Sequence, residues 1–230
     1  MEEFGNSLTS ASEKTIGNER TKIVEIAEFF TDPEAVCAAS QTKQFAQINP
    51  HYPGIRAEVE PGLLDVLCAS VSEMASQHLG QAKYTWQGQA WYSIVTQPAQ
   101  SLTPIQRLPH FDGFDEAQLA VMIYLGQTPH GGTAFYRQRS TGFERVTQAR
   151  YPEYKTHLEA GVRQTGLPPA AYISDGAPLF EKVYESDGVF NSLILYPGTS
   201  LHSGVIRNDR PLSADPGLGR LTINGFFRPA

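Results

Sequence analysis

The sequence is poor in cysteine, in basic charge and in long apolar runs, and each scarcity excludes a class of protein. Its two cysteines, Cys37 and Cys68, lie far apart in apolar, helix-like segments, so we expect two reduced thiols rather than a disulfide framework. A formal net charge of −6 argues against a broad electrostatic grip on nucleic acid or on an anionic membrane. Small molecules or peptides remain as partners.

Signals for membrane insertion and export are also missing. No apolar run approaches the roughly 20 residues that span a bilayer. The opening stretch, MEEFGNSLTSASEK, has neither the basic end nor the apolar core of a secretory signal. We therefore expect a cytoplasmic protein with no nucleic-acid or membrane partner, present as a monomer or a homodimer.

The 230 residues are enough for one domain with a single core. Residues 1–20 are polar and lack periodicity, so we expect a flexible N-terminal tail. Residues 21–84 predict a strand followed by two helices, because each helical segment has a proline near its start and the second has apolar residues at helical spacing. Residues 21–230 are expected to form one domain that begins with these helices.

The pattern changes after residue 84. Short apolar runs separated by glycine, proline and asparagine are typical of a sandwich or barrel of short strands. Residues 140–190 differ, since they mix charge, tyrosine and proline around a candidate helix in YPEYKTHLEAGVRQ. We interpret this segment as an insertion between core strands, because a structureless loop of such length is improbable. The predicted fold class is mainly β with flanking helices (α+β).

His110 and Asp112 stand two positions apart in the stretch RLPHFDGFDEAQ. Side chains two apart in an extended segment point the same way, so the pair is suited to bind one object. An ordinary polar loop explains the same pair until a third ligand is found. His202 is a candidate, because it follows an apolar strand and a Pro-Gly turn. Two histidines and one carboxylate form the facial triad of non-haem Fe(II) oxygenases.

Arg220 heads an apolar strand in GRLTINGFF, and Thr222 and Asn224 share its face by the period of two. An arginine at a strand edge either extends to solvent or binds a ligand carboxylate through two parallel hydrogen bonds. The second interpretation strengthens the case for a metal site that also takes a carboxylate ligand.

Five motifs, taken in order, resemble those of Fe(II)/2-oxoglutarate-dependent oxygenases, closest to the prolyl-4-hydroxylase-like branch. They span about residues 85–230 and read HFD, AVMIYLG, HGGTAFY, NSLILYPGTSLHSG and GRLTINGFF. The resemblance implies a double-stranded β-helix core (jelly-roll, cupin-like) whose open end holds iron. It also implies a dioxygenase that uses Fe(II), 2-oxoglutarate and O₂ to hydroxylate a C–H bond of a small molecule, amino acid or peptide, with release of succinate and CO₂.

The resemblance also assigns roles to single positions. The iron ligands of the family are matched by His110, Asp112 and His202. Arg220 matches the residue that binds the distal carboxylate of 2-oxoglutarate, and the groups that join it in relatives are matched by Tyr124 and Thr222.

The insertion over residues 140–190 has no counterpart in the minimal fold, and we expect substrate specificity there. Its ends are anchored near the metal, so we predict a lid over the barrel mouth. The side chains expected to line the pocket or its entrance are Arg137, Arg139, Tyr151, Tyr154, Tyr172 and Phe180. The alternatives are a segment that packs on the outside or mediates self-association, and arginines that form a solvated basic surface.

Two other classes of function remain open from the sequence. A zinc-dependent hydrolase also uses two histidines and an aspartate, but it leaves Arg220 and Tyr124 without a shared task. A metal-free jelly-roll binding module explains the strands and the Gly-Gly turn, but it leaves the triad unexplained. Succinate formation from 2-oxoglutarate separates the oxygenase from both.

Overall fold

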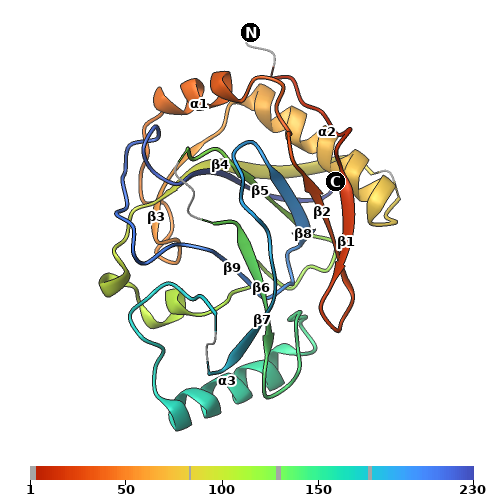
Figure 1. The fold of residues 1–230 in the computed structure, drawn as a ribbon. Coiled ribbons are helices and arrows are strands. Elements are labelled where there is room, and N and C mark those ends of the chain that lie inside the picture. Colours follow the sequence, from red (N-terminus) through yellow and green to blue (C-terminus); the bar gives the residue numbers. More distant parts are fainter. Residues whose placement is uncertain (1–3, 83, 128–130, 176–177) are drawn as a thin grey trace.

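The computed structural model describes residues 4–82, 84–127, 131–175 and 178–230. Within these ranges, ten strands and three α-helices give a mainly β structure (Figure 1). The strands lie in two antiparallel sheets, neither of which closes on itself. One has the order β1-β2-β8-β5-β10-β4-β3 and the other the order β7-β6-β9. The predicted class, mainly β with flanking helices, is confirmed.

The bounds of the elements are as follows. The large sheet contains β1 (Ser12–Ile16), β2 (Thr21–Ile26), β3 (Gly54–Glu58), β4 (Trp86–Val95), β5 (Leu119–Tyr124), β8 (Leu193–Pro197) and β10 (Leu221–Pro229). The small sheet contains β6 (Thr133–Gln138), β7 (Phe180–Glu185) and β9 (His202–Gly204). The helices are α1 (Pro33–Gln41), α2 (Pro61–His78) and α3 (Tyr151–Thr165).

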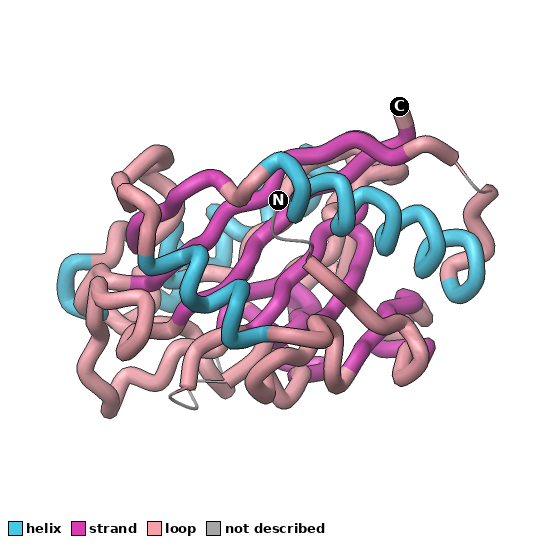
Figure 2. The backbone as a smooth tube through the Cα atoms, turned by 90° about the horizontal axis from the view of Figure 1, so that it is seen from above, coloured by secondary structure: helices cyan, strands magenta, loops and turns pink. Residues whose placement is uncertain are grey.

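Helices α1 and α2 cover the outer face of the large sheet (Figures 1 and 2). Helix α1 begins at the N-cap Asp32, whose carboxylate accepts a hydrogen bond from the Ala35 N–H at 3.0 Å. Helix α2 begins at a proline and buries one apolar stripe against the sheet, formed by Leu63, Leu67, Val71 and Met74. Burying each such side chain contributes about 1.5–3 kcal/mol. Both predicted helices are confirmed.

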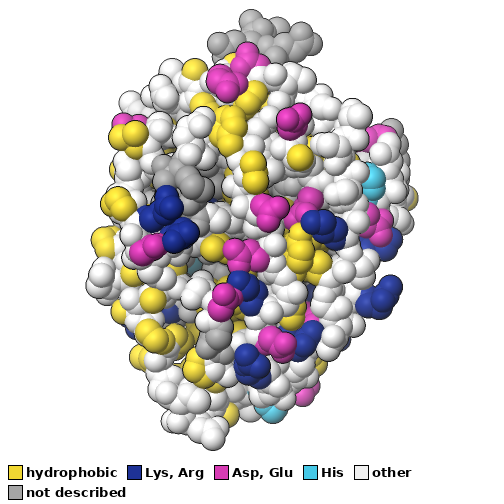
Figure 3. Space-filling view, in the orientation of Figure 1, with side chains coloured by type: hydrophobic (Ala, Val, Ile, Leu, Met, Phe, Trp, Pro, Cys, Tyr) yellow, Lys and Arg dark blue, Asp and Glu magenta, His cyan; other side chains and the backbone are white. Residues whose placement is uncertain are grey.

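The scarce residue types behave as the sequence suggests. Cys37 on α1 and Cys68 on α2 are free thiols, as predicted. Burial, followed by the nearby carboxylate of Glu34, raises the pKa of Cys37 to about 11. Basic and acidic side chains are interspersed on the face shown in Figure 3. None of the helices in the described part of the chain has the length and apolarity that a membrane crossing requires.

The flexible tail predicted for residues 1–20 is wrong for much of its length. Ser12–Ile16 forms β1, which pairs with β2 in antiparallel register. The turn between these strands is held by the carboxylate of Glu144, which accepts hydrogen bonds from two N–H groups of the turn. The strand was hidden in the sequence because β1 lies at a sheet edge, where four of its five residues are exposed. Residues 1–3 lie outside the described ranges.

The segment 140–190 is less independent of the core than predicted. Its expected helix is confirmed as α3. Phe180–Glu185, however, forms β7 and pairs with β6, so this part of the segment is a strand of the small sheet. Helix α3 packs on the outer face of that sheet through Tyr154, next to Tyr136. It therefore lies behind the sheet rather than over the space between the sheets, contrary to the predicted lid.

The inner face of the large sheet carries a polar row formed by Arg56, Ser93, Thr222 and Tyr124. Directly paired residues of antiparallel strands share a face, and the registers pair Arg56 with Ser93, Ser93 with Thr222, and Thr222 with Tyr124. The alternate residues of these strands point into the helix-covered core. An apolar cluster joins the two sheets further along the same face. The space between the sheets is thus polar at one end.

Candidate metal centre

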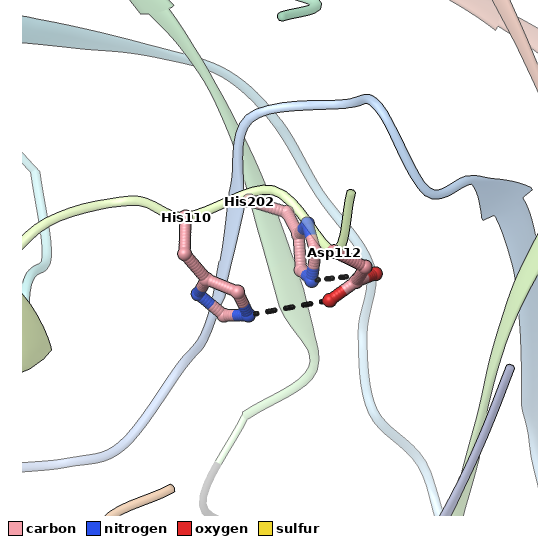
Figure 4. A group of neighbouring side chains, drawn as sticks. All are labelled: His110, Asp112 and His202. Atoms are coloured by element: carbon pink, nitrogen blue, oxygen red, sulfur yellow. Dashed lines mark ion pairs between the residues drawn. The ribbon is translucent and has the colours of Figure 1, made fainter. Parts of the chain in front are cut away.

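His110, Asp112 and His202 form a compact group of metal-ligating side chains at this polar end (Figure 4). Their ligand atoms all lie within 4.8 Å of one another. The Nε2 atom of His110 is 3.7 Å from Asp112 Oδ1, and the Nε2 atom of His202 is 3.7 Å from Asp112 Oδ2. His110 is exposed and His202 is buried. The structure therefore brings together the three residues that the sequence singled out, with room for one ion between them.

Backbone pairing holds these distant residues in place. The N–H groups of His110 and His202 each donate to the carbonyl oxygen of the other at 2.8 Å. The Asp112 N–H donates to the Gly198 carbonyl, also at 2.8 Å. Strand β9 pairs with β6 so that His202 lies opposite Phe135, whose side chain packs into the space between the sheets. Both sides of the group are therefore anchored to the small sheet.

The His202 imidazole is oriented for metal binding. Its Nδ1 atom lies 2.9 Å from the carbonyl oxygen of Ser200. Because a carbonyl only accepts, Nδ1 carries the proton and Nε2 keeps its lone pair. Burial lowers the pKa of His202 to about 4, although the bond to Ser200 opposes the shift. The ring is neutral at pH 7, the form that binds a metal.

Asp112 presents a buried oxygen that no hydrogen-bond donor among the described residues satisfies. Its Oδ2 atom has no hydrogen-bond partner. Burial raises the pKa of Asp112 to about 6, while His110 and Arg56 act in the opposite direction. A buried carboxylate of this kind is costly unless a cation compensates it. Two imidazoles and one such carboxylate, all on one side of a common centre, fit a divalent first-row ion such as Fe(II).

Arg220 is buried close to the end of β9 and has no carboxylate partner among the described residues. Gly204 lies against its guanidinium. Its Nη2 donates to the carbonyl oxygens of Gly131 and Gly132 at 3.2 Å and 3.0 Å, while Nε has no partner. Burial lowers the pKa of Arg220. A buried cation with free donors fits a ligand carboxylate, which accepts two parallel hydrogen bonds from a guanidinium.

Tyr124 lies beside Arg220, and Thr222 follows Arg220 two positions on, in β10. The Cζ atom of Arg220 is 5.7 Å from the centroid of the Tyr124 ring. The Tyr124 hydroxyl is 2.7 Å from Thr133 Oγ1 and 3.1 Å from Ser186 Oγ. The Thr222 hydroxyl is already bonded within the sheet. Thr133 and Ser186 were missed, since a lone hydroxyl carries no sequence signal.

Arg137 and Arg139, proposed as substrate residues, lie elsewhere. Arg137 forms ion pairs with Glu144 at 2.5 Å and with Glu181 at 3.2 Å. Its hydrogen bond with Glu144 raises its pKa. Arg139 is exposed just after β6. Arg137 thus stabilises the β1–β2 turn through Glu144, and within the described residues no contact joins either arginine to the metal-ligating group.

Tyr151 and Tyr154 support the loop that carries His110 and Asp112 from behind. The Tyr154 ring lies 6.1 Å from that of Phe111 at 89°, and the Tyr151 ring lies 5.0 Å from that of Phe114. Phe111 stands between the two ligands of the H-x-D pair, so its side chain points away from theirs. The two tyrosines therefore contact the far side of the loop. Phe180 packs in one apolar cluster with these two tyrosines, Phe111 and Phe114.

Sequence reasoning missed Arg56 and Tyr52 altogether. The positive charge of Arg56 acts on Asp112 and lowers its pKa. Tyr52 and Tyr172 both act electrostatically on Arg220. Tyr172 is thus the one predicted pocket residue that the structure brings near the site. No local motif marks Arg56, because its place depends on the pairing of β3 with β4.

The architecture and the inward-facing metal-ligating group define a jelly-roll protein of the double-stranded β-helix class, as predicted. HygX from Streptomyces hygroscopicus with iron bound is similar at a TM-score of 0.50 and 13% identity, over 92% of this chain and 84% of that chain. HygX with nickel, 2-oxoglutarate and hygromycin B bound has a TM-score of 0.50 at 11% identity over the same shares. A Pseudomonas putida prolyl-4-hydroxylase has a TM-score of 0.48 at 13% identity, over 90% and 92% of the two chains.

The chain belongs to the family described as "Family of unknown function (DUF6445)", whose model matches residues 9–227. No curated protein matches the sequence. The family assignment covers β1 as well as both halves of the metal-ligating group, which supports the inclusion of the N-terminal hairpin in the fold.

Proposed function

We propose that the protein is an Fe(II)- and 2-oxoglutarate-dependent oxygenase that hydroxylates a C–H bond of a small molecule, amino acid or peptide. The observation that carries this proposal is the presence of a His–Asp–His group and an unpaired, buried Arg220 at one end of the same interior space. The HygX structures add support, since the same fold there holds a metal and 2-oxoglutarate. A zinc-dependent hydrolase or a metal-free binding module would give no shared task to both features.

Each residue has a separate part in the proposed reaction. His110, Asp112 and His202 hold the ion on one side and leave its other positions open. Arg220 orients the cosubstrate by its distal carboxylate, and Tyr124 donates a further hydrogen bond there. When bound, the iron supplies the oxidative chemistry that converts 2-oxoglutarate, O₂ and a C–H group to succinate, CO₂ and C–OH. The protein contributes the positions of the ion and the cosubstrate, and the charges that hold them there.

The proposal extends to the whole chain. We propose a single oxygenase domain in which β1 is part of the sheet, rather than a domain that starts at residue 21. A cytoplasmic location, action without nucleic acid or membrane, and a monomeric or homodimeric state stay as predictions from the sequence.

The test is aerobic incubation with Fe(II), 2-oxoglutarate and a panel of metabolites and peptides. We expect succinate to form only when both Fe(II) and 2-oxoglutarate are present, and one panel member to gain the mass of one oxygen atom. Asp112→Asn should abolish succinate formation, whereas Asp115→Asn, which changes an exposed carboxylate of the same loop, should not. Failure of the Fe(II)-loaded protein to bind 2-oxoglutarate would overturn the proposal.

A further inference from the structure

Two arginines in the described part of the chain have a buried Nε atom without a hydrogen-bond partner, Arg220 and Arg56. The proposed function uses Arg220 but leaves Arg56 without a task. Arg137 and Arg150, by contrast, are paired with carboxylates, Arg137 with Glu144 and Arg150 with Glu19. Arg56 has no such ion pair with any described carboxylate.

Arg56 faces the same interior space as Arg220 but at a separate place. It begins the polar row, opposite Ser93, and strand β4 separates it from Thr222. Neighbouring strands are about 4.8 Å apart, so the Cα atoms of Arg56 and Thr222 are about 10 Å apart. Arg220 stands two positions before Thr222, next to β10, so the two arginines come from segments that are not neighbours in the sheet. They are therefore suited to bind two different anionic groups.

Asp112, one of the candidate metal ligands, is the one carboxylate among the described groups that act on the charge of Arg56. The two are nevertheless not within ion-pair distance of each other. A divalent ion held by Asp112 would neutralise that carboxylate and leave the guanidinium without a described protein carboxylate to balance its charge. A ligand anion bound at Arg56 would compensate the positive charge of its guanidinium.

Aromatic rings hold the Arg56 guanidinium and leave donors free. Its Cζ atom lies 4.0 Å from the centroid of the Tyr52 ring and 5.6 Å from that of Trp91. A guanidinium stacked on a ring keeps its N–H groups directed outward in its own plane. The Tyr52 hydroxyl is close to Arg56 and Ser93, yet it is buried without a hydrogen-bond partner of ordinary geometry. The site therefore offers a planar donor fork, a hydroxyl and the partly exposed face of an indole.

We propose that Arg56, together with Tyr52 and Trp91, binds a carboxylate of the prime substrate, separate from the 2-oxoglutarate carboxylate at Arg220. The inference rests on the proposed function, because it assigns the substrate of that same site to the class of carboxylic acids. The indole of Trp91 and the ring of Phe226, 6.1 Å apart, provide an apolar surface for the body of such an acid.

The experiment uses matched pairs of probes that differ in one charge. N-acetyl-leucine and N-acetyl-phenylalanine carry a free carboxylate, and their primary amides are neutral and of the same shape. Each is titrated anaerobically into the full chain loaded with Mn(II) and 2-oxoglutarate, by calorimetry and by tryptophan fluorescence. The fluorescence is informative because Trp91 lies beside Arg56, whereas the other tryptophan, Trp86, is buried in the helix-covered core.

We expect the wild-type protein to bind the acid of at least one pair at least about tenfold more tightly than the amide. Arg56→Gln should remove this preference while leaving the affinity for 2-oxoglutarate unchanged. Arg228→Gln, which changes an exposed arginine at the end of β10, should keep the preference. Tyr52→Phe should reduce the preference for the acid over the amide by a smaller factor. If Arg56→Gln does not fold, Tyr52→Phe tests the proposal in its place.

The outcomes separate this inference from the proposed function. Metal and 2-oxoglutarate binding without any preference for acid over amide would overturn the inference alone. An Arg56→Gln variant that retains the preference, or that loses 2-oxoglutarate binding instead, would also overturn it. Metal binding without 2-oxoglutarate binding would overturn the proposed function, and the preference would still be read on the metal-loaded protein.

Discussion

His110 and His202 are far apart in sequence, yet they exchange two backbone hydrogen bonds of 2.8 Å, and their ring centroids are 4.3 Å apart. The two histidines are therefore held by main-chain contacts that do not depend on the imidazoles. Loss of one ring leaves this pairing in place. Metal affinity and folding should accordingly be separable by mutation.

His202→Ala should lower the affinity for Fe(II) or Mn(II) by at least about 100-fold. Mutating a residue that only hydrogen-bonds to a metal ligand typically lowers metal affinity about 10–100-fold, and loss of the ligand itself should cost more. The variant should still fold, with a moderate loss of stability from the missing contact with Tyr196. Anaerobic metal titration measures the affinity. His157→Ala, an exposed histidine on α3, is the control and should bind metal normally. Wild-type affinity in His202→Ala would rule out the proposed ligand set.

Arg220→Gln should weaken 2-oxoglutarate binding by at least about tenfold, since truncating one partner of a buried charge pair costs about 2–5 kcal/mol. Tyr124→Phe should cause a smaller loss, because one hydrogen bond is removed. Calorimetry on the Mn(II)-loaded proteins measures both. Metal affinity should be retained in each variant, and unchanged 2-oxoglutarate affinity in Arg220→Gln would contradict the assigned role.

Tyr154→Ala should destabilise the protein by about 3 kcal/mol, as expected for removal of a large buried ring. The ring is 5% exposed and packs on Phe111, in the loop that carries His110 and Asp112. Lys155→Ala, at the next and exposed position of α3, should change the free energy of unfolding by less than about 0.5 kcal/mol. Urea denaturation compares the two. Similarly small effects of the two substitutions would show that α3 is not packed against the loop. The interpretation of α3 as a lid would then stand again.

Gly132→Ala should destabilise the fold and weaken 2-oxoglutarate binding together. A Cβ atom at Gly132 would lie 2.1 Å from the backbone oxygen of Ser186, and the Gly132 carbonyl is an acceptor for Arg220. Gly62→Ala is the matched control, because nothing lies within 4 Å of its Cβ position in α2. It should be neutral or stabilising by up to about 1 kcal/mol. Thermal unfolding and calorimetry give both quantities.

Cys37 should react slowly with iodoacetamide at pH 8. Its pKa is raised to about 11, so the nucleophilic thiolate is a small fraction of the folded protein at that pH. The same thiol should react at the rate of an ordinary cysteine in urea, where burial is lost. Mass spectrometry of the Cys37 peptide follows the reaction. Equal rates in the folded and unfolded protein would show that the thiol is not buried.

The sequence was sufficient for features whose signal is local. Helix α2 could be predicted from its opening proline and its apolar spacing, and the H-x-D pair from the alternation of side chains. His202, the third candidate ligand, and Arg220 were proposed from strand motifs that keep their order along the chain. These positions lie in or next to regular strands, where sequence position determines the face.

Features that depend on long-range pairing could not be predicted. Arg137 looked free in the sequence, but the fold brings Glu181 and Glu144 against it. Arg56 has no local signal in the sequence, and only the register between β3 and β4 places it on the inner face. Edge strand β1 lacked an apolar alternation because almost all of it is exposed. In each case the deciding contact is with a residue that the local pattern does not identify.

The position of β10 in the large sheet has a consequence for synthesis of the protein. This strand follows every other strand of the described chain, yet it pairs on both sides, with β4 and with β5. While the ribosome is still making the chain, β4 and β5 therefore each wait with an unpaired edge, which is prone to pair with other chains. The sheet can be completed only after translation has passed β10, so chaperones have an aggregation-prone intermediate to protect until then.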